Sequence, residues 1–290
     1  VYNNVKLLKT NSNYHLRQGF SEIFKYALLG SKELLQLLFK YKNDKSENTL
    51  LEILAETISV RLKIRKRHVL ASNFGHTFGH AFEKYSNLEG DYYEFGVFQG
   101  SSIISVALIF KTLGIKKKLY GFDSFGGFPS YNKNDQFKMF YELFKKKKIS
   151  KEHYKNIFNL KKIRNFTNQK KNKLLTPKNI STSLDFSNNS LSNLKKKIKL
   201  LKLNNINLIK GNFRETLPRF FRKNSKNKIL LANIDCDLYE SYKLALNYIW
   251  PSLTKKGIIY LDEYYSLKFP GARIASNEFF KKKKIKPIKI

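Results

Sequence analysis

Two acidic clusters follow predicted β-strands and have the clearest potential for chemistry. One contains Asp235, and the other pairs Asp262 with Glu263. The carboxyl ends of parallel strands meet at one edge of a sheet, so we expect these three side chains to converge there. Carboxylates that lie close together repel unless they share a cation, and an all-oxygen set suits Mg²⁺ better than zinc. The pattern therefore predicts a Mg²⁺ site, and the simpler alternative is that the acids only cap the strand ends.

A glycine-containing turn between a strand and a helix supplies the second candidate site. Gly96 and Gly100 follow a β-rich stretch, and residues 101–113 then have helical length. Glycine lets a ligand approach the backbone, and free amides at the start of the helix lie beside it. The next predicted strand ends at Asp123, which can accept hydrogen bonds from ribose hydroxyls. The glycines alone are equally typical of close packing, but together with the acid they indicate a nucleotide-type site.

A pair of histidines forms a third candidate. His76 and His80 are four residues apart, so a helix would place both on one face, as a metal site requires. Such a pair is often structural. Here both histidines are flanked by glycine, with Asn73 and Glu83 close in sequence, which favours the metal or catalytic reading as strongly as the structural one.

These candidate sites depend on two different patterns along the chain. Up to about residue 85, apolar residues recur every three or four positions, which is typical of helices; the stretches concerned are 21–29, 32–41 and 50–66. From Gly90 onward, β-rich runs alternate with helical stretches, which is typical of a doubly wound parallel sheet. We therefore expect a small all-helical segment at residues 1–86 and an α/β domain at residues 87–290.

The α/β part contains several predicted strands and one insertion. The strands are expected at residues 92–97, 119–123, 206–210, 229–235 and 257–262, and the helices include 101–113, 191–203 and 239–248. A lysine-rich stretch at residues 137–178 lacks glycine, and we expect its helical portions to form a lid over the carboxyl ends of the strands. Residues 285–290 resemble the start of a further strand, so we expect a closing hairpin to be cut short.

The composition allows a large core and raises the question of a polyanion partner. Hydrophobic residues make up 42% of the 290, and the formal net charge is +34, which would suit nucleic acid. Only nine of the 56 basic residues are arginine, the better reader of phosphates and bases. The lysine excess accompanies abundant Asn, Ile, Phe and Tyr, as AT-rich codons would produce. Specific nucleic-acid binding is therefore the weaker alternative.

Other features bear on location and completeness. The longest apolar run, residues 103–110, is too short to cross a bilayer, and no secretory signal is recognisable. A single cysteine, Cys236, excludes an internal disulfide framework. These features predict a cytoplasmic protein that does not bind membranes. Because the chain begins at Val1 and Met139 is its only methionine, we expect it to be a fragment.

Residues 17–84 resemble the carboxyl-terminal domain of 3-dehydroquinate synthase and related sugar-phosphate cyclases. The matching motif is the glycine- and histidine-rich segment 73–83, preceded by Glu22 on an earlier predicted helix. The resemblance implies that Glu22 and His76 are zinc ligands. It also implies active-site positions for Lys25, Asn73 and His80.

The cyclase resemblance is incomplete. The family's third zinc ligand is a downstream histidine, but residues 88–92 take that place, and no histidine occurs between His80 and His153. The NAD-binding amino-terminal domain is also missing from this sequence. Zinc would be poorly held and NAD would have no binding site, so we expect an inactive remnant. A zinc- and NAD-dependent cyclase is the alternative function.

Residues 89–280 resemble the macrocin O-methyltransferase family, metal-dependent enzymes that use S-adenosylmethionine. The resemblance rests on five motifs in the same order along the chain. They are Glu94-Phe95-Gly96-Val97 with Gly100-Ser101, Gly121-Phe122-Asp123-Ser124-Phe125 with Gly127 and Pro129, Lys210-Gly211-Asn212-Phe213 with Thr216-Leu217-Pro218, Ile234-Asp235-Cys236-Asp237-Leu238-Tyr239-Glu240-Ser241, and Asp262-Glu263-Tyr264 with Pro270-Gly271-Ala272. The resemblance implies a class I, Rossmann-like methyltransferase sheet.

The methyltransferase resemblance also implies roles for individual residues. Glu94, Gly96 and Ser101 would line the methionine end of the cofactor, Gly100 would be a further cofactor-binding residue, and Asp123 would hold the ribose. Asp235, Asp262 and Glu263 would ligate Mg²⁺. The family often has two aspartates at the last position, so the ligand role of Glu263 departs mildly from the pattern. Asp235 is the expected proton acceptor when a hydroxyl is methylated.

The leading hypothesis is therefore a Mg²⁺-assisted O-methyltransferase. The expected acceptor is a small molecule carrying a sugar or polyol hydroxyl. Tyr264 and Tyr265 are candidates for stacking on a sugar face, although core or surface roles are equally consistent with such a tyrosine-rich chain. The resemblance further implies a homo-oligomer.

Overall fold

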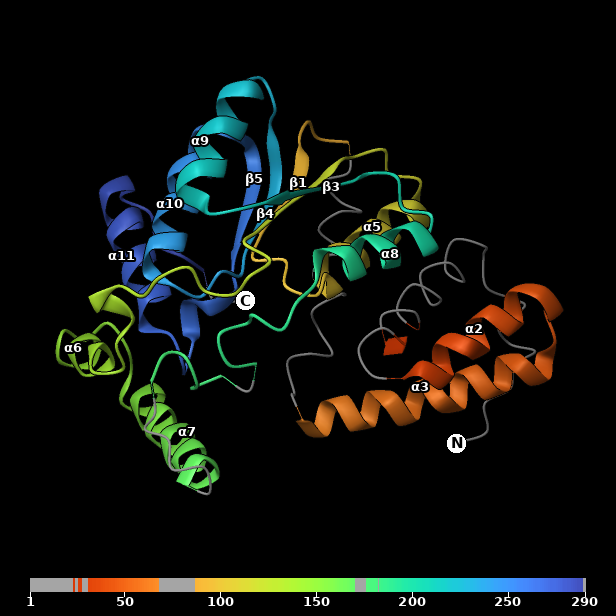
Figure 1. Cartoon of the computed structure of the whole chain (residues 1–290), viewed down its shortest axis with the longest axis horizontal. Helices are drawn as coiled ribbons and strands as arrows, with labels where there is room; N and C mark the ends of the chain where they lie inside the picture. Colours follow the sequence, from red (N-terminus) through yellow and green to blue (C-terminus); the bar gives the residue numbers. More distant parts are fainter. Residues whose placement is uncertain are drawn as a thin grey trace. The chain divides into compact units, whose positions relative to one another are not determined.

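The computed structural model describes residues 23, 26–27, 31–67, 87–169, 176–181 and 183–288 (Figure 1). The chain divides into two compact units. One unit comprises residues 1–88, 100–117 and 202–204, and the other comprises residues 89–99, 118–201 and 205–290. Among the helices that the structure describes, none combines the length and the apolar character needed to cross a bilayer.

The first unit contains a helical hairpin. Helices α2 (Lys32–Asp44) and α3 (Glu47–Arg67) extend the predicted stretches by a few residues, and the chain turns between them at Lys45, which has a left-handed φ of 52°. Ser31 caps α2 by accepting from the Leu34 amide, and its hydroxyl donates to Glu56 of α3 over 2.8 Å. The hairpin core consists of Tyr26, Ala27, Leu34, Ile53 and Val60.

Helix α5 (Ser101–Leu113) has the bounds that the sequence predicts and is grouped with this first unit. It begins after Gly100 and ends before Gly114, and both glycines have a positive φ, 82° and 69°. Left-handed backbone costs little only for glycine, so this pair of glycines marks both ends of the helix.

The second unit is built on a parallel sheet, which confirms the predicted α/β fold class. Its strands are β1 (Asp91–Phe95), β2 (Leu119–Asp123), β3 (Ile206–Lys210), β4 (Ile229–Ile234) and β5 (Leu253–Leu261). They lie in the order β3-β2-β1-β4-β5, and every pairing between them is parallel. The direction of winding reverses between β1 and β4, the place where open α/β sheets bind ligands.

The last strand begins earlier than the sequence pattern predicts. Leu253, not Gly257, is the first residue of β5, and it pairs with Ile229 before a register shift brings Ile258 opposite Leu231. Residues 285–288, expected to start a further strand, have no regular structure, and Ile288 is almost fully exposed. Lys286 and Lys289 are three positions apart and fall on opposite faces of an extended chain, so neither face is apolar.

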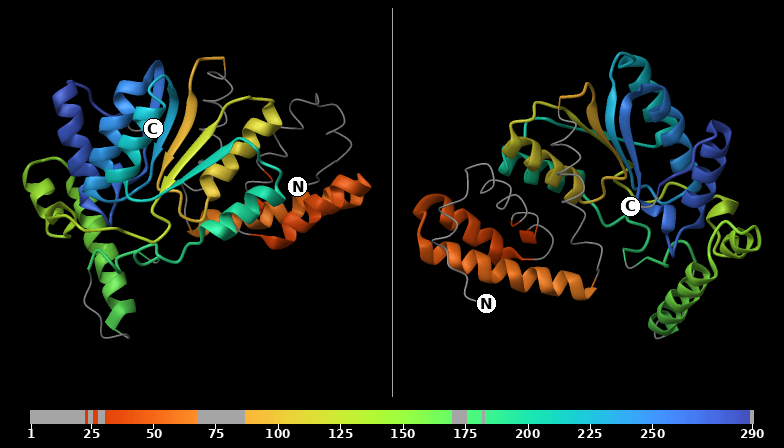
Figure 2. Two further views of the ribbon diagram at one scale, coloured as in Figure 1. Left: turned by 45° about the horizontal axis from the view of Figure 1, so that its top comes forward. Right: turned by 180° about the vertical axis from the view of Figure 1, so that it is seen from behind.

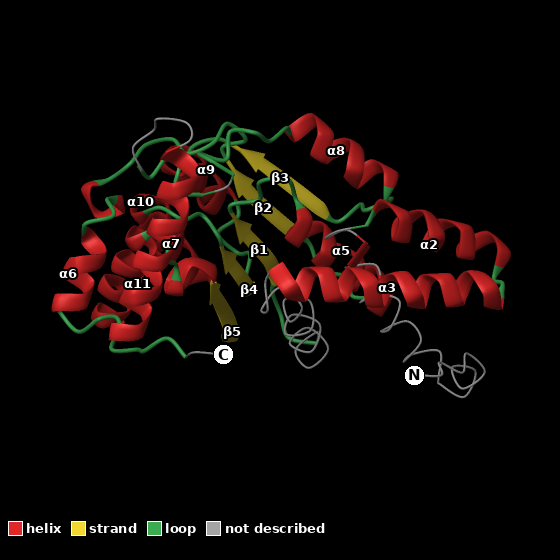
Figure 3. Cartoon of the chain, turned by 90° about the horizontal axis from the view of Figure 1, so that it is seen from below, coloured by secondary structure: helices red, strands yellow, loops and turns green. Residues whose placement is uncertain are grey.

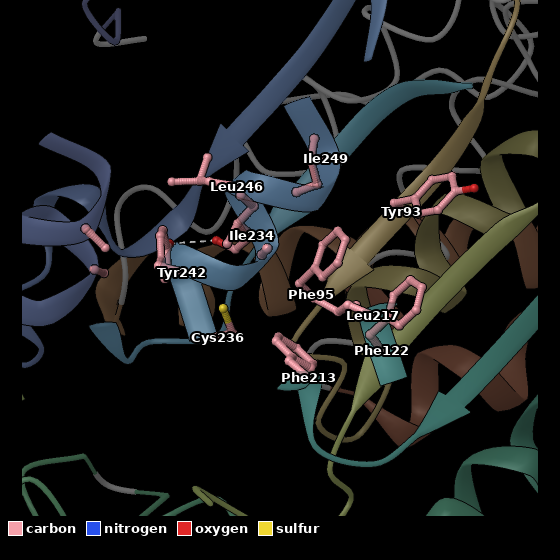
Figure 4. Packing of buried hydrophobic residues seen from close by; sticks show 14 of the residues in the cluster. Tyr93, Phe95, Phe122, Phe213, Leu217, Ile234, Cys236, Tyr242, Leu246 and Ile249 are labelled. Atoms are coloured by element: carbon pink, nitrogen blue, oxygen red, sulfur yellow. Dashed lines mark hydrogen bonds between the residues drawn. The ribbon is translucent and has the colours of Figure 1, made fainter. Parts of the chain in front are cut away.

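Helices cover both faces of the sheet in this unit. Helices α9 (Phe213–Lys223), α10 (Tyr239–Ser252) and α11 (Pro270–Lys283) lie on one face, and α8 (Leu191–Leu200) lies on the other (Figures 2 and 3). The core under α9 and α10 is rich in aromatic side chains (Figure 4). Phe95 of β1 stacks on Phe122 of β2 with ring centroids 5.0 Å apart. Buried aromatic pairs of this kind contribute more than their buried area alone.

The insertion is helical, as the sequence predicts, and is fastened to the sheet unit at its start. It contains α6 (Met139–Lys145) and α7 (Lys151–Gln169), preceded by a short 3₁₀ turn that ends at Asp135. Asp135 is buried, and its carboxylate accepts from the Tyr239 amide at the start of α10 over 2.7 Å. A Cβ on Gly271 would lie 1.9 Å from the same carboxylate, so the first turn of α11 must carry glycine there. Burial raises the pKa of Asp135.

Candidate active site

The two acidic clusters meet at the carboxyl edge of the sheet. Ile234 and Leu261 are the last paired residues of β4 and β5, so Asp235 and Asp262 follow them side by side. Oxygen atoms of Asp235, Asp237 and Glu263 lie within 4.8 Å of one another. The structure thus brings together two of the three predicted ligands, adds Asp237, and leaves Asp262 outside this closest set. Asp262 still lies close enough to Asp235 for its negative charge to raise the pKa of that residue.

A tight backbone turn explains why Asp237 joins the group. Its φ is 59°, in the left-handed region, and the Leu238 amide donates to the Cys236 carbonyl over 2.6 Å. This turn reverses the chain between the end of β4 and the start of α10 and returns the Asp237 carboxylate toward Asp235. Non-glycine residues seldom adopt such a backbone, although aspartate tolerates it better than most. The only sequence sign of this role is the spacing of two aspartates after a strand.

Neighbouring carboxyl groups help to raise the pKa of Asp235 and of Asp237. For Asp235 the causes are burial, then the negative charges of Asp262 and Asp237, and its pKa lies well above the ordinary value. The pKa of Asp237 is also well raised, by burial and by Glu263, with partial relief from Lys268. Asp235 and Asp237 therefore retain protons at a pH where free aspartates have lost them.

Asp262 stands at the rim of the same group. The residue as a whole is exposed, yet its carboxyl group is crowded enough that desolvation, followed by repulsion from Glu263, raises its pKa to about 6. A hydrogen bond with Tyr260 and the positive charge of Lys268 act in the opposite direction. Asp262 is therefore the member of the group that solvent reaches most easily.

The donor set fits a divalent cation that prefers oxygen. Opposite oxygens around Mg²⁺ are about 4.2 Å apart, since each bond is about 2.1 Å long, and the observed span of 4.8 Å is close to that value. The Ca–O bond of about 2.4 Å fits the span as well, so both ions must be tested. The closest set contains neither histidine nor cysteine, which disfavours zinc.

Asp123 at the end of β2 shapes the glycine turn. One carboxylate oxygen accepts from the Val97 and Phe98 amides at 2.8 Å each, and the other accepts from the Phe125 amide at 2.6 Å. A carboxylate offers about four acceptor positions, so roughly one remains for a ribose hydroxyl. The structure thus shows a turn-stabilising role for Asp123 that the sequence did not reveal.

Gly96 joins the glycine turn to the acidic edge. Its φ is +94°, and a Cβ built on it would lie 1.8 Å from the Asp235 carbonyl oxygen. The Asp235 amide donates to the Phe95 carbonyl over 2.8 Å, which fixes the same contact from the other strand. Close packing therefore accounts for this glycine directly, and it makes the two candidate sites immediate neighbours.

The other predicted cofactor residues have different settings. Glu94 is fully buried on β1 beside Asn233 of β4, and it accepts from the Tyr92 hydroxyl over 2.5 Å. Gly100 is the residue before α5, and Ser101 is the first, exposed residue of that helix in the other unit.

The predicted zinc site lies outside the described residues. This applies to Glu22, His76, Lys25, Asn73 and His80. Residues 88–92, which take the place of the cyclase family's third ligand, lead into β1. Gly90 there has a φ of +111°, and a Cβ on it would lie 2.7 Å from the Leu230 amide nitrogen. The packing of the sheet thus governs this segment in the present chain.

Two family models match the chain, one in each part. Residues 160–289 match the model described as macrocin-O-methyltransferase (TylF). Residues 19–100 match the model described as 3-dehydroquinate synthase C-terminal. The first match includes all four clustered acids, and the second extends through β1 to the glycine turn. Both recognitions made from the sequence are therefore confirmed, as is the prediction that the chain contains a methyltransferase-type enzyme segment.

Relatives of known description fall into the same two groups. The 3-dehydroquinate synthases of Bacillus pumilus and Pyrococcus abyssi are 31% and 32% identical over 127 and 125 residues, which cover 41% and 40% of this chain. The chain spans about a third of the length of these relatives, 33% and 34%. The crystal structure of CalS11, a calicheamicin methyltransferase, is similar over 90% of this chain and 88% of its own, with 22% identity and a TM-score of 0.57. Likeness at this identity shows the methyltransferase fold.

Proposed function

We propose that the sheet unit is an S-adenosylmethionine-dependent, Mg²⁺-assisted O-methyltransferase that acts on a sugar or polyol hydroxyl. The observation that carries the proposal is the convergence of Asp235, Asp237 and Glu263 beside the glycine turn, with Gly96 in contact with Asp235. This arrangement can hold a cation and a nucleotide cofactor next to each other at the switch point of the sheet. The match to the macrocin-O-methyltransferase model over residues 160–289 supports the same reaction type.

The cofactor would lie against the turn that follows β1. Asp123 would hold the ribose, because its carboxylate keeps about one acceptor position beyond the three amides that donate to it. Glu94, Gly96, Gly100 and Ser101 are the remaining proposed cofactor-binding residues. S-adenosylmethionine supplies an electrophilic methyl group on a sulfonium, and Mg²⁺ lowers the pKa of a coordinated hydroxyl.

The acidic group would orient the acceptor and receive its proton. Asp235, Asp237 and Glu263 would hold the cation, and Asp262 at the rim would complete or orient the set. Asp235 is the proposed proton acceptor, because it belongs to the cation site and its backbone contacts Gly96 of the glycine turn, so a hydroxyl held by the cation would lie next to it. When an acceptor hydroxyl is methylated, the Asp235 carboxylate would take up the hydroxyl proton.

A sugar is the proposed acceptor class. A second structure of CalS11 is described as a TDP-rhamnose 3'-O-methyltransferase, with 18% identity and a TM-score of 0.50. In this chain Tyr265 follows the acidic pair, keeps 46% of its surface exposed and contacts His153 with ring centroids 6.3 Å apart. Its ring offers a stacking face for a sugar. The Arg273 guanidinium lies over both rings, 3.9 Å from the Tyr264 centroid and 4.8 Å from the Tyr265 centroid. Tyr264 is less suited, because it is less exposed and its hydroxyl donates to Asn277.

The first unit is proposed to have no cyclase activity of its own. Residues 88–92, at the place of the cyclase family's third zinc ligand, include no histidine. A cytoplasmic location, a homo-oligomeric state and the absence of a specific nucleic-acid partner stay predictions from the sequence.

A calorimetric titration tests the proposed function. The purified chain is expected to bind S-adenosylmethionine and S-adenosylhomocysteine, and to bind Mg²⁺ in a manner that Asp235→Asn abolishes. Absence of heat with both nucleosides would overturn the methyltransferase proposal. Stoichiometric zinc retained through purification would favour the cyclase instead, and tight DNA binding that falls steeply with salt and ignores Asp235→Asn would favour a nucleic-acid-binding protein.

A further inference from the structure

Tyr242 links the end of β4, which precedes Asp235, to the segment that carries Glu263. It lies on α10 with no exposed surface. Its hydroxyl donates to the Ile234 carbonyl over 2.7 Å and accepts from the Glu263 amide over 3.0 Å. The first of these contacts is drawn in Figure 4, where the ring points from α10 toward the end of β4.

The two contacts fall on the residues that determine where the candidate ligands stand. Ile234 is the last residue of β4 and precedes Asp235, whereas Glu263 is itself a member of the closest set. The pairing of β4 with β5 ends at Ile234 and Leu261. Beyond that point the tyrosine hydroxyl supplies the next link between the two chain segments.

The direction of both hydrogen bonds is fixed by chemistry. A carbonyl oxygen can only accept and an amide can only donate, so the hydroxyl must give its one proton to Ile234 and receive from Glu263. Its geometry is therefore determined at both ends. Removing the oxygen would leave a buried carbonyl and a buried amide without this partner, and each such loss is costly in a dry core.

We propose that Tyr242 is a positioning residue for the cation site, setting the separation between Asp235 and Glu263 without touching the ion. The inference rests on the proposed function, since it concerns the same cation. A purely structural tyrosine would contribute to stability alone. A positioning tyrosine also determines how tightly the carboxylates hold a cation, as partners behind metal ligands commonly do.

The matched pair Tyr242→Phe and Tyr239→Phe separates these two roles. Both tyrosines lie on α10, and the Tyr239 hydroxyl donates to Glu278 of α11 over 2.7 Å, away from the acidic group. Each variant keeps the ring and loses one hydroxyl. We expect both to unfold at a lower temperature, but only Tyr242→Phe to bind Mn²⁺ or Mg²⁺ about 10-fold more weakly, with affinity for S-adenosylmethionine changed less than about 2-fold.

The titrations use Mn²⁺ followed by electron paramagnetic resonance, and Mg²⁺ followed by calorimetry. Equal cation affinities for the two variants and the wild type would overturn the positioning role while leaving the proposed function intact. A wild-type chain that binds neither cation would overturn both, and retained binding of S-adenosylmethionine would then show that only the cation part fails.

A measurement on the wild-type chain covers the case in which Tyr242→Phe does not fold. Hydrogen exchange of the Glu263 amide should be as slow as that of the β4 amides, because the buried hydroxyl accepts from it. Exchange at the rate of fully exposed amides would overturn the inference independently of any variant.

Discussion

Aspartates at the same edge of one sheet have opposite environments. Asp123, after β2, accepts hydrogen bonds from three backbone amides. Asp235, after β4, faces other carboxylates, and burial together with those charges raises its pKa. The first carboxylate stabilises the folded chain by itself. The second costs stability until a proton or a cation neutralises the group, so the position of an acid at a strand end does not determine its role; its neighbours do.

The contact between the glycine turn and the acidic edge, where Gly96 meets Asp235, should be the most sensitive to substitution. Gly96→Ala would place a methyl group 1.8 Å from the Asp235 carbonyl in a backbone with φ of +94°, so we expect a loss of about 3–5 kcal/mol in the free energy of unfolding. Gly114→Ala is the control, because φ there is +69° but no atom lies within 4 Å, and about 1 kcal/mol should be lost. Urea denaturation measures both. Similar losses for the two variants would refute the close packing of turn and acidic edge.

Replacing Asp123 or Asp235 by asparagine should change the stability of the cation-free protein in opposite directions. Asp123→Asn weakens hydrogen bonds to a charged acceptor, and we expect a loss of about 2 kcal/mol in the free energy of unfolding without added cation. Asp235→Asn removes repulsion, so the cation-free protein should be equally or more stable, while Mg²⁺ affinity falls at least about 100-fold. Denaturation with a chelator present and calorimetry with Mg²⁺ give the two readings. A destabilised Asp235→Asn chain would mean that its carboxylate is already neutralised within the protein.

The pH dependence of the stability should reveal the raised pKa of Asp262 at the acidic edge. The pKa of Asp262 is about 6 in the folded state and 3.8 ordinarily. As pH rises from about 4 to 6, the unfolded chain loses this proton while the folded chain keeps it, so stability falls across this window and the loss persists above it. Relative to Asp262→Asn, the wild type with chelator should thus become less stable between pH 4 and 7.

Thermal unfolding of the two proteins across this range measures the difference. Added Mg²⁺ should remove it at pH 7, because the cation binds the charged carboxylates and displaces protons. A constant difference at every pH would contradict the raised pKa.

The smallest expected effect is the difference in Mg²⁺ affinity between variants of the individual acids. Asp237 belongs to the closest set and Asp262 does not, so Asp237→Asn should lower Mg²⁺ affinity about 100-fold and Asp262→Asn about 10-fold or less. Calorimetry on both variants decides the ligand set. The reverse order would restore the set expected from the sequence, in which Asp262 is the ligand.

Much of the sheet could be predicted from the sequence because its strands are short apolar runs ended by acids or glycines. The same alternation placed Asp235 and Asp262 at one edge. The start of β5 could not be predicted, because Leu253 joins the strand through a register shift opposite Ile229, which depends on the neighbouring strand.

The details of the site depend on contacts that no local pattern contains. Asp237 enters the acidic group through a left-handed backbone at that residue. Gly96 is required by the carbonyl of a residue more than a hundred positions later, and Asp123 is engaged by amides of the preceding loop. No sequence pattern indicated the role proposed for Tyr242, since one tyrosine among many on an apolar helix face is typical of core packing.

The buried carboxylate of Asp135 has a consequence for how this chain can be shortened. It precedes the helical insertion, yet it holds the start of α10 and fits against Gly271. An excision that begins after Asp135 keeps this fastening, although it also removes the buried cluster of Phe140, Leu143, Ile149 and Ile157 and the Lys148 carbonyl that accepts from Arg273. One that begins a few residues earlier would detach the loop carrying Asp237 from its support, although neither cut touches an acidic residue of the site.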